Sequence, residues 1–185
     1  IPFNQLAVCF HYLDTFQHIT GTLLNEVSAN FENAKVYNPR GKKFFDNAGI
    51  IVSKNKFNQK IIINISAEQG HARQVSLAYR TGILNFNFIS GRLELNLRQK
   101  KFIKKPTYLY ALPSINKYFK IKLSDVSYST LQNLEKLISN KNILNDLNIS
   151  KNNVKVLIAS YISNEFLGKK INLNKIKLNK KFLWA

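Results

Sequence analysis

Residues 80–105, RTGILNFNFISGRLELNLRQKKFIKK, indicate a β-hairpin followed by a basic arm. With Ser90 and Gly91 as a two-residue turn, apolar residues of the two strands lie opposite each other on one face. The expected pairs are Phe88–Leu93, Phe86–Leu95 and Leu84–Leu97 on this face, and Asn87–Glu94, Asn85–Asn96 and Ile83–Arg98 on the other. A slip of one residue would exchange the two faces, so the pattern predicts this register. The apolar face is expected to join a core.

The rest of the centre also has the composition of strands. The segments 49–53 and 60–66 are short and rich in β-branched residues, and the polar residues between them predict a hairpin with a longer loop. Residues 73–79 alternate apolar with polar or small side chains, which favours a strand, although a short helix also fits. In 119–123, apolar residues alternate with Lys120 and Lys122, which predicts a last strand with a basic face.

Helical spacing of apolar residues occurs on both sides of this centre. In the first part of the chain it predicts helices over 4–18 and 22–33. After residue 124 it predicts helical segments at 129–138, where Ser129 and Gln132 form a capping-box pattern, at 143–147 and at 150–167. Gly168 stands where a glycine commonly ends a helix.

The expected fold class is therefore α+β. We predict N-terminal helices (1–35), a central, mostly antiparallel sheet (42–125) and C-terminal helices (126–168), together forming one domain over residues 1–168. A basic C-terminal extension, 169–185, follows. No segment approaches the length of a transmembrane span.

The formal net charge of +18 is the strongest functional signal. A field of that size favours a polyanionic partner, and nucleic acid is the commonest one. The cations are mostly lysine, which meets phosphate as a point charge, whereas arginine also reads base edges. The abundance of Lys, Asn and Ile is also typical of AT-rich coding sequence, which is a competing explanation for the lysine content.

The expected nucleic-acid contacts are two basic clusters with nearby aromatic residues, at 98–105 and at 169–181. A few cations at 40–43, before the central strands, are expected to join them. The alternative for each lysine is a solvated face with the aromatic residues in the core. The predicted phosphate-binding residues are Arg40, Lys42, Lys43, Arg98, Lys100, Lys101, Lys104, Lys105, Lys169, Lys170, Lys175, Lys177, Lys180 and Lys181. Phe102, Tyr108 and Trp184 are the predicted stacking or anchoring residues.

Catalytic and metal-binding patterns are weak by comparison. The chain has neither a Gly-rich nucleotide-binding motif nor the motifs of common RNA-binding modules. Cys9, His11, Asp14 and His18 are the only group with metal-ligand residue types, and no second group completes a metal site. The more common explanation of this group is a helix with two polar histidines among packed aromatic residues. We therefore expect no catalytic residues, no metal and no cofactor.

These patterns together predict a structural RNA-binding protein of a large ribonucleoprotein, most plausibly a ribosomal protein that contacts rRNA in a mitochondrion. Its expected partners are RNA and neighbouring proteins of the assembly, with no small-molecule substrate. Two alternatives are a DNA-binding or DNA-processing protein of an AT-rich phage or plasmid, in a bacterial cytoplasm, and an accessory subunit of a membrane-associated complex. Since the sequence contains no methionine, we expect the chain to be processed or trimmed.

Overall fold

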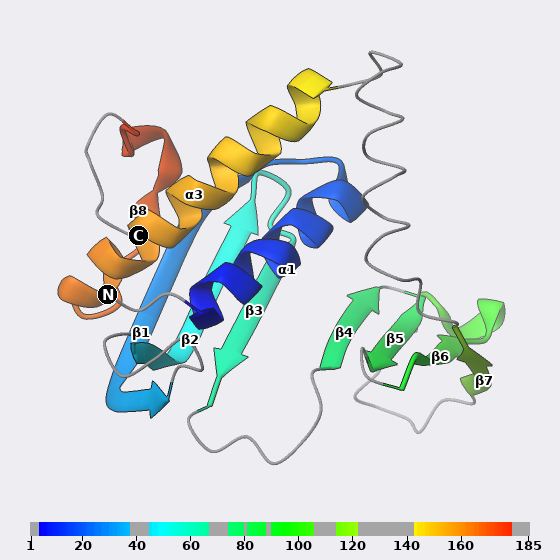
Figure 1. Ribbon diagram of the computed structural model, residues 1–185. Helices are drawn as coiled ribbons and strands as arrows, with labels where there is room; N and C mark the ends of the chain where they lie inside the picture. Colours follow the sequence, from blue (N-terminus) through cyan, green and yellow to red (C-terminus); the bar gives the residue numbers. More distant parts are fainter. Residues whose placement is uncertain are drawn as a thin grey trace. The chain divides into compact units, whose positions relative to one another are not determined.

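The computed structural model describes residues 4–37, 45–66, 74–79, 81–87, 90–105, 114–121 and 143–178. These residues form two α-helices, short 3-10 segments and two four-stranded antiparallel sheets (Figure 1). Backbone contacts divide the chain into two units, Ile1–Gln69 with Lys136–Ala185 (unit 1) and Gly70–Glu135 (unit 2). None of the described helices is long and apolar enough to cross a bilayer.

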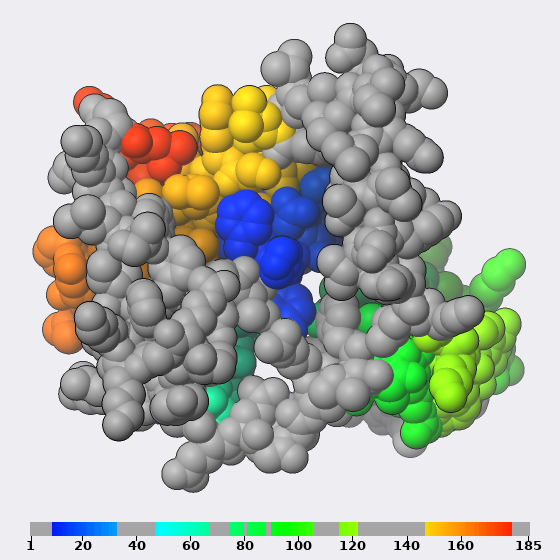
Figure 2. All heavy atoms as spheres, viewed as in Figure 1, coloured from blue at the N-terminus to red at the C-terminus, as the bar shows by residue number. Residues whose placement is uncertain are grey.

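Unit 1 is a sheet with two helices packed on one face. Its strands are β1 (Leu24–Tyr37), β2 (Phe45–Asn55), β3 (Lys60–Ile65) and β8 (Ile171–Asn172), in the order β3-β2-β1-β8. The helices α1 (Asn4–Thr20) and α3 (Ile143–Glu165) lie over the same side of β1, β2 and β3 (Figure 1). From this side their atoms form much of the coloured surface of unit 1 (Figure 2).

The core of unit 1 lies between this sheet and the two helices. Val27, Ala29 and Ile51 are fully or almost fully buried on the helix side of the sheet. Leu13 of α1 and Val156 of α3 pack against them. The chain leaves α3 through a Schellman motif, in which Gly168 N donates to Ser163 O (2.8 Å) and Leu167 N donates to Asn164 O (3.1 Å).

Unit 2 is a meander of four strands. These are β4 (Gln74–Tyr79), β5 (Gly82–Asn87), β6 (Arg92–Arg98) and β7 (Ser114–Lys120), paired in chain order. The 3-10 segment η1 (Lys100–Phe102) follows β6, and a second one, η2 (Leu173–Lys175), follows β8 in unit 1. Antiparallel neighbours adjacent in sequence need only short connections, which explains the meander.

The predicted layout of N-terminal helices, central sheet and C-terminal helices was wrong. Residues 24–37 form β1 and not a second helix, and the strands belong to two sheets. Leu24, Val27 and Phe31 fit a helical period, but Val27, Ala29 and Phe31 also fit a strand with one face inward. The paired strand β2 decides between the two periods. The predicted segment 129–138 lies outside the described residues, and the proposed domain limits stay a prediction.

The hairpin of residues 82–98 was predicted with the correct faces and the wrong register. The observed partners are Phe86–Leu93, Leu84–Leu95 and Gly82–Leu97, displaced by two residues from the expected pairs. β5 ends at Asn87 and β6 begins at Arg92, so the connection is longer than the predicted two-residue turn. A displacement by an even number of residues keeps each side chain on the same face of the sheet. The alternation of apolar and polar residues therefore cannot distinguish the two registers.

Candidate active site

One face of α1 carries three side chains that can exchange protons, and we call it the histidine face: His11, Asp14 and His18. Their spacing of three and four residues places them on one side of the helix. An adjacent side carries Leu13 and Gln17, both fully buried. The packing of this buried side therefore leaves His11 and His18 exposed, with Asp14 between the two sides.

Asp14 and His18 form a pair on this face. His18 Nδ1 lies 2.9 Å from the backbone oxygen of Asp14 and 3.5 Å from its carboxylate Oδ2. A carbonyl oxygen only accepts hydrogen bonds, so Nδ1 carries the donated hydrogen and a neutral ring has its lone pair on Nε2. The two side chains are 36% (Asp14) and 48% (His18) exposed, which leaves the pair accessible to a ligand.

A chain of buried amide side chains holds Asp14 from behind. Asn153 of α3 donates through Nδ2 to Asp14 Oδ1 (3.1 Å), and Gln17 donates through Nε2 to Asn153 Oδ1 (2.6 Å). Gln17 Oε1 in turn accepts from the backbone N–H of Leu24 (2.9 Å). Gln17 and Asn153 are both fully buried, so each hydrogen bond offsets a desolvation cost. The carboxylate is thus fixed to both helices and to β1.

This arrangement suits proton transfer better than metal binding. A histidine that donates through Nδ1 beside a carboxylate can act as a general base through Nε2, since the carboxylate stabilises the protonated ring. His11 supplies a second exposed imidazole on the same face, in edge contact with Phe10 (ring centroids 6.3 Å apart). Within the described residues, no group of three or more His, Cys, Asp or Glu side chains could hold a metal ion.

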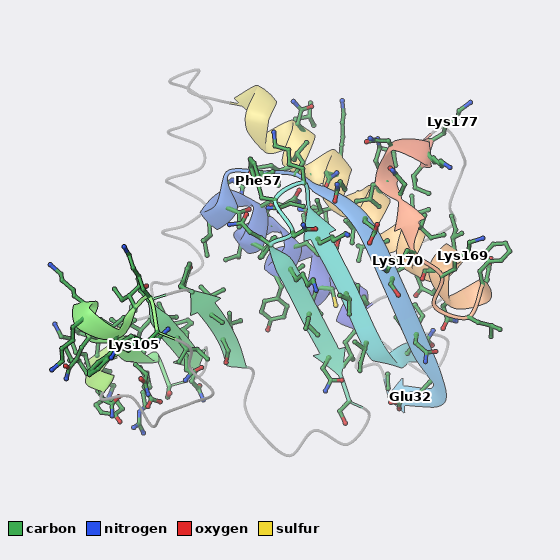
Figure 3. All side chains as sticks on the ribbon, turned by 180° about the vertical axis from the view of Figure 1, so that it is seen from behind. Glu32, Phe57, Lys105, Lys169, Lys170 and Lys177 are labelled. Carbon is green, nitrogen blue, oxygen red and sulfur yellow. The ribbon has the colours of Figure 1, made fainter. Side chains whose placement is uncertain are left out.

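The predicted phosphate-binding residues lie in both units, and the structure describes part of them. Arg40, Lys42, Lys43, Lys180, Lys181, Tyr108 and Trp184 lie outside the described residues. Lys169, Lys170, Lys175 and Lys177 are exposed after the end of α3, where Figure 3 labels three of them. The assignment of these residues stays a prediction.

Arg98 has a structural role that its charge did not suggest. Its guanidinium donates to the backbone oxygens of Phe102 (2.6 Å), Ile103 (3.4 Å) and Lys105 (2.5 Å). These bonds close the turn around η1. Arg98 is therefore occupied with backbone oxygens of its own chain.

The lysines around this turn are exposed and lie near one aromatic ring. Lys101 and Lys105 place their Nζ atoms 4.9 and 5.6 Å from the ring centroid of Phe102. Lys100 and Lys104 are also exposed. Two cations beside one half-buried ring form cation–π contacts within the turn, and the role of Phe102 as a stacking residue stays a prediction.

Solved structures share this fold. A protein described as an NADPH-dependent oxidoreductase from Desulfitobacterium hafniense matches 95% of this chain with a TM-score of 0.64 and 12% identity. UDP-N-acetylglucosamine 3-dehydrogenase from Acidithiobacillus ferrooxidans matches 86% (TM-score 0.59, 13% identity), and an NAD-binding protein from Listeria innocua matches 88% (TM-score 0.54, 15% identity). This chain has the fold of one part of these proteins. It spans about half their length, 48–49% of each.

Comparison of sequences alone finds no relative. No family model matches the chain, and no curated protein matches it.

The shared fold overturns the functional predictions. The neighbours are oxidoreductases and an NAD-binding protein, so the prediction of a ribosomal RNA-binding protein was wrong, as were its DNA-binding and membrane-complex alternatives. The predictions of no enzymatic activity, of RNA and assembly proteins as partners, and of no small-molecule substrate were wrong for the same reason. Net charge is a poor indicator of function here because it describes a surface potential and says nothing of the fold.

The sequence indicated the residues of the histidine face, but it did not indicate the buried amide side chains that hold Asp14. The buried amides Gln17 and Asn153 are far apart in the chain, and no local pattern links them. The available signal was Gln17 on the apolar side of a helix, next to Leu13 in helical spacing. A polar side chain on that side requires a buried partner.

Proposed function

We propose that the chain is part of a nicotinamide-dinucleotide-linked oxidoreductase and that the histidine face of α1 transfers the substrate proton. The observation that carries the proposal is the Asp14–His18 pair, which Asn153 of α3 holds in place within a fold shared with oxidoreductases. Such enzymes interconvert alcohols and carbonyls, and the hydroxyl proton needs an acceptor. His18, which donates through Nδ1 beside the Asp14 carboxylate, is suited to accept this proton at Nε2.

The described residues do not fit a site for the dinucleotide itself. The common dinucleotide-binding crevice lies at the carboxyl ends of parallel strands, beside a Gly-rich turn into a helix. Both sheets in the described ranges are antiparallel, and the sequence contains no G-x-G-x-x-G motif. The cofactor's phosphates therefore have no binding turn in this part, and we assign to this chain only substrate binding and proton transfer.

The test is a turnover assay on the native protein, purified from its source and supplied with NAD or NADP. A panel of sugars, sugar nucleotides and hydroxy acids, with UDP-N-acetylglucosamine among them, provides the substrates. His11→Ala and His18→Ala should each fold normally, and the variant that loses the general base should lose about 100-fold or more in kcat. Ile19→Ala, an exposed position outside the histidine face, is the matched control and should keep its activity.

The two histidine variants also separate the roles of the residues. A loss of kcat marks the residue that moves the proton, whereas a rise in KM alone marks one that only binds substrate. Full turnover by a folded His11→Ala/His18→Ala double variant would reject the proposal.

A further inference from the structure

One face of the sheet in unit 2 is apolar across all four strands. Paired residues of neighbouring strands share a face, so the register defines its members. We call it the apolar sheet face; it consists of Val75, Leu77, Tyr79, Gly82, Leu84, Phe86, Leu93, Leu95, Leu97, Ile115, Lys117 and Phe119. Lys117 is its only charged member. The opposite face carries polar and charged residues, among them Asn85, Glu94 and Asn96.

The side chains of the apolar sheet face are not buried within the structure. Tyr79, Ile115 and Phe119 are 53%, 46% and 48% exposed, and the described apolar side chains of β5 and β6 are only partly buried. Unit 1 differs, because its sheet has fully buried residues such as Val27 and Ile51 under the helices. Within the described residues, the apolar sheet face thus lacks the covering layer that a sheet normally has.

The exposed apolar area is large for a monomer. An aromatic side chain presents about 150–250 Å² in total, so Tyr79 and Phe119 alone leave on the order of 200 Å² uncovered. The aliphatic neighbours extend this area toward the upper end of the patches seen on monomers, about 300–600 Å². A stable interface needs about 800 Å² from each partner. The face can therefore supply most of one side of an interface.

We propose that this face binds the same face of a second copy of the chain. Two such faces can pack sheet on sheet about a two-fold axis, at the usual spacing of about 10 Å. A polyanionic partner would need several cations on the surface that it contacts, and this face has one. The single charge of the face, Lys117, lies on the edge strand β7, so a two-fold axis through the middle of the face would place the two lysines at opposite edges of the interface and leave apolar residues against apolar residues at its centre.

The net charge of the chain gives this dimer a distinctive salt dependence. Two copies of charge +18 repel each other, and salt screens that repulsion. Dimerisation should therefore strengthen as sodium chloride rises from about 0.1 M to about 1 M, where the screening length falls from about 10 to about 3 Å. Association through a bound polyanion would weaken over the same range.

Sedimentation velocity on the native protein tests the proposal with two adjacent residues of β7. Phe119→Glu places a charge on the apolar sheet face, and Tyr118→Glu places the same charge on the opposite face, at a similarly exposed position (48% and 56%). We expect a dimer for the native chain and for Tyr118→Glu, and at least a tenfold weaker dimer for Phe119→Glu. Ile115→Glu is a second variant on the apolar sheet face, for use where Phe119→Glu fails to fold.

Two results would overturn the proposal. One is a native chain that stays monomeric up to about 100 μM at low and high salt, which would mean that another part of the chain or a different protein covers the face. The other is an equal loss of dimer in the Phe119→Glu and Tyr118→Glu variants. Both readouts are independent of catalysis, so they do not depend on the proposed function.

Discussion

Leu167 is the residue whose backbone conformation fits its side chain least. It occupies the left-handed region (φ 54°) in the turn that ends α3, and its side chain is 97% exposed. A non-glycine residue pays about 1–2 kcal/mol in that region. Because the side chain has almost no contacts, nothing local offsets this cost.

Replacing Leu167 by glycine should therefore stabilise unit 1. Glycine loses about 0.5–1 kcal/mol more chain entropy on folding, so the net gain in free energy of unfolding should be about 0.5–1 kcal/mol. Urea unfolding measures it. Leu167→Ala keeps the strained conformation and should show no such gain; an equal gain in both variants would disprove the explanation.

Gly49 of β2 is a glycine that close packing requires. A Cβ atom there would collide with the backbone oxygen of Asn30 and the Cα of Phe31, and its φ of 142° is unfavourable for other residues. Gly49→Ala should lower the free energy of unfolding by about 2 kcal/mol or more. Gly21→Ala, with a positive φ but open space around it, should cost only about 1 kcal/mol. If urea unfolding gave the same loss of unfolding free energy for Gly49→Ala and Gly21→Ala, the structure would be relieving the collision at position 49.

At the scale of elements, α3 completes the hydrogen bonding of β1. β8 pairs with β1 only at Glu26 and Val27. Beyond that point, the N–H groups of Ala29 and Phe31 donate to Ser163 Oγ (2.9 Å) and Asn164 Oδ1 (2.6 Å) of the helix. Helix side chains thus replace part of a neighbouring strand and protect the edge of β1.

Two buried serines of α3 test this role. Ser163 binds β1 and also donates to Lys169 O (2.7 Å), whereas Ser160 donates only to carbonyls of its own helix. Ser163→Ala leaves a buried N–H without its acceptor and should cost about 1–3 kcal/mol in thermal unfolding. Ser160→Ala should cost less than about 0.5 kcal/mol, because its helix carbonyls keep their backbone partners. Comparable losses in the two variants would contradict this role of α3.

The alternating pattern predicted most of the central strands. The hairpin of β2 and β3 is confirmed, as are strand β4, for which a short helix was the alternative, and the faces of β5 and β6. β1 was assigned wrongly because Val27 and Phe31 satisfy two periods, and only pairing with β2 distinguishes them. The hairpin register depends on the length of the turn, which the alternating pattern does not encode.

For the whole molecule, the fold and the charge give different indications of function. Figure 3 shows the sheet of unit 1 from the side opposite its two helices, with Lys169, Lys170 and Lys177 labelled, and the net charge of +18 favours a polyanion. The fold instead matches oxidoreductases, and the site proposed from it is a small cluster on α1. Of that cluster, the sequence indicated His11, Asp14 and His18, but not the supporting contact from Asn153, which lies 139 residues from Asp14.

In the proposed function, Asp14 acts on His18 through its charge and is more than a link between helices. The double variant Asp14→Asn/Asn153→Asp exchanges the two hydrogen-bond partners. It separates the effect of the Asp14 charge on His18 from the link between the two helices. The amide at position 14 can donate to the new carboxylate, and Gln17 can donate to its other oxygen, so part of the stability lost in Asp14→Asn should return. The negative charge, however, no longer lies beside His18.

The most direct measurement is therefore dinucleotide-linked turnover of this exchanged variant, compared with the native protein and with Asp14→Asn. We predict that stability recovers while kcat stays at the low level of Asp14→Asn, about 100-fold or more below the native value. If turnover returns together with stability, Asp14 only joins the two helices, and its charge has no part in proton transfer.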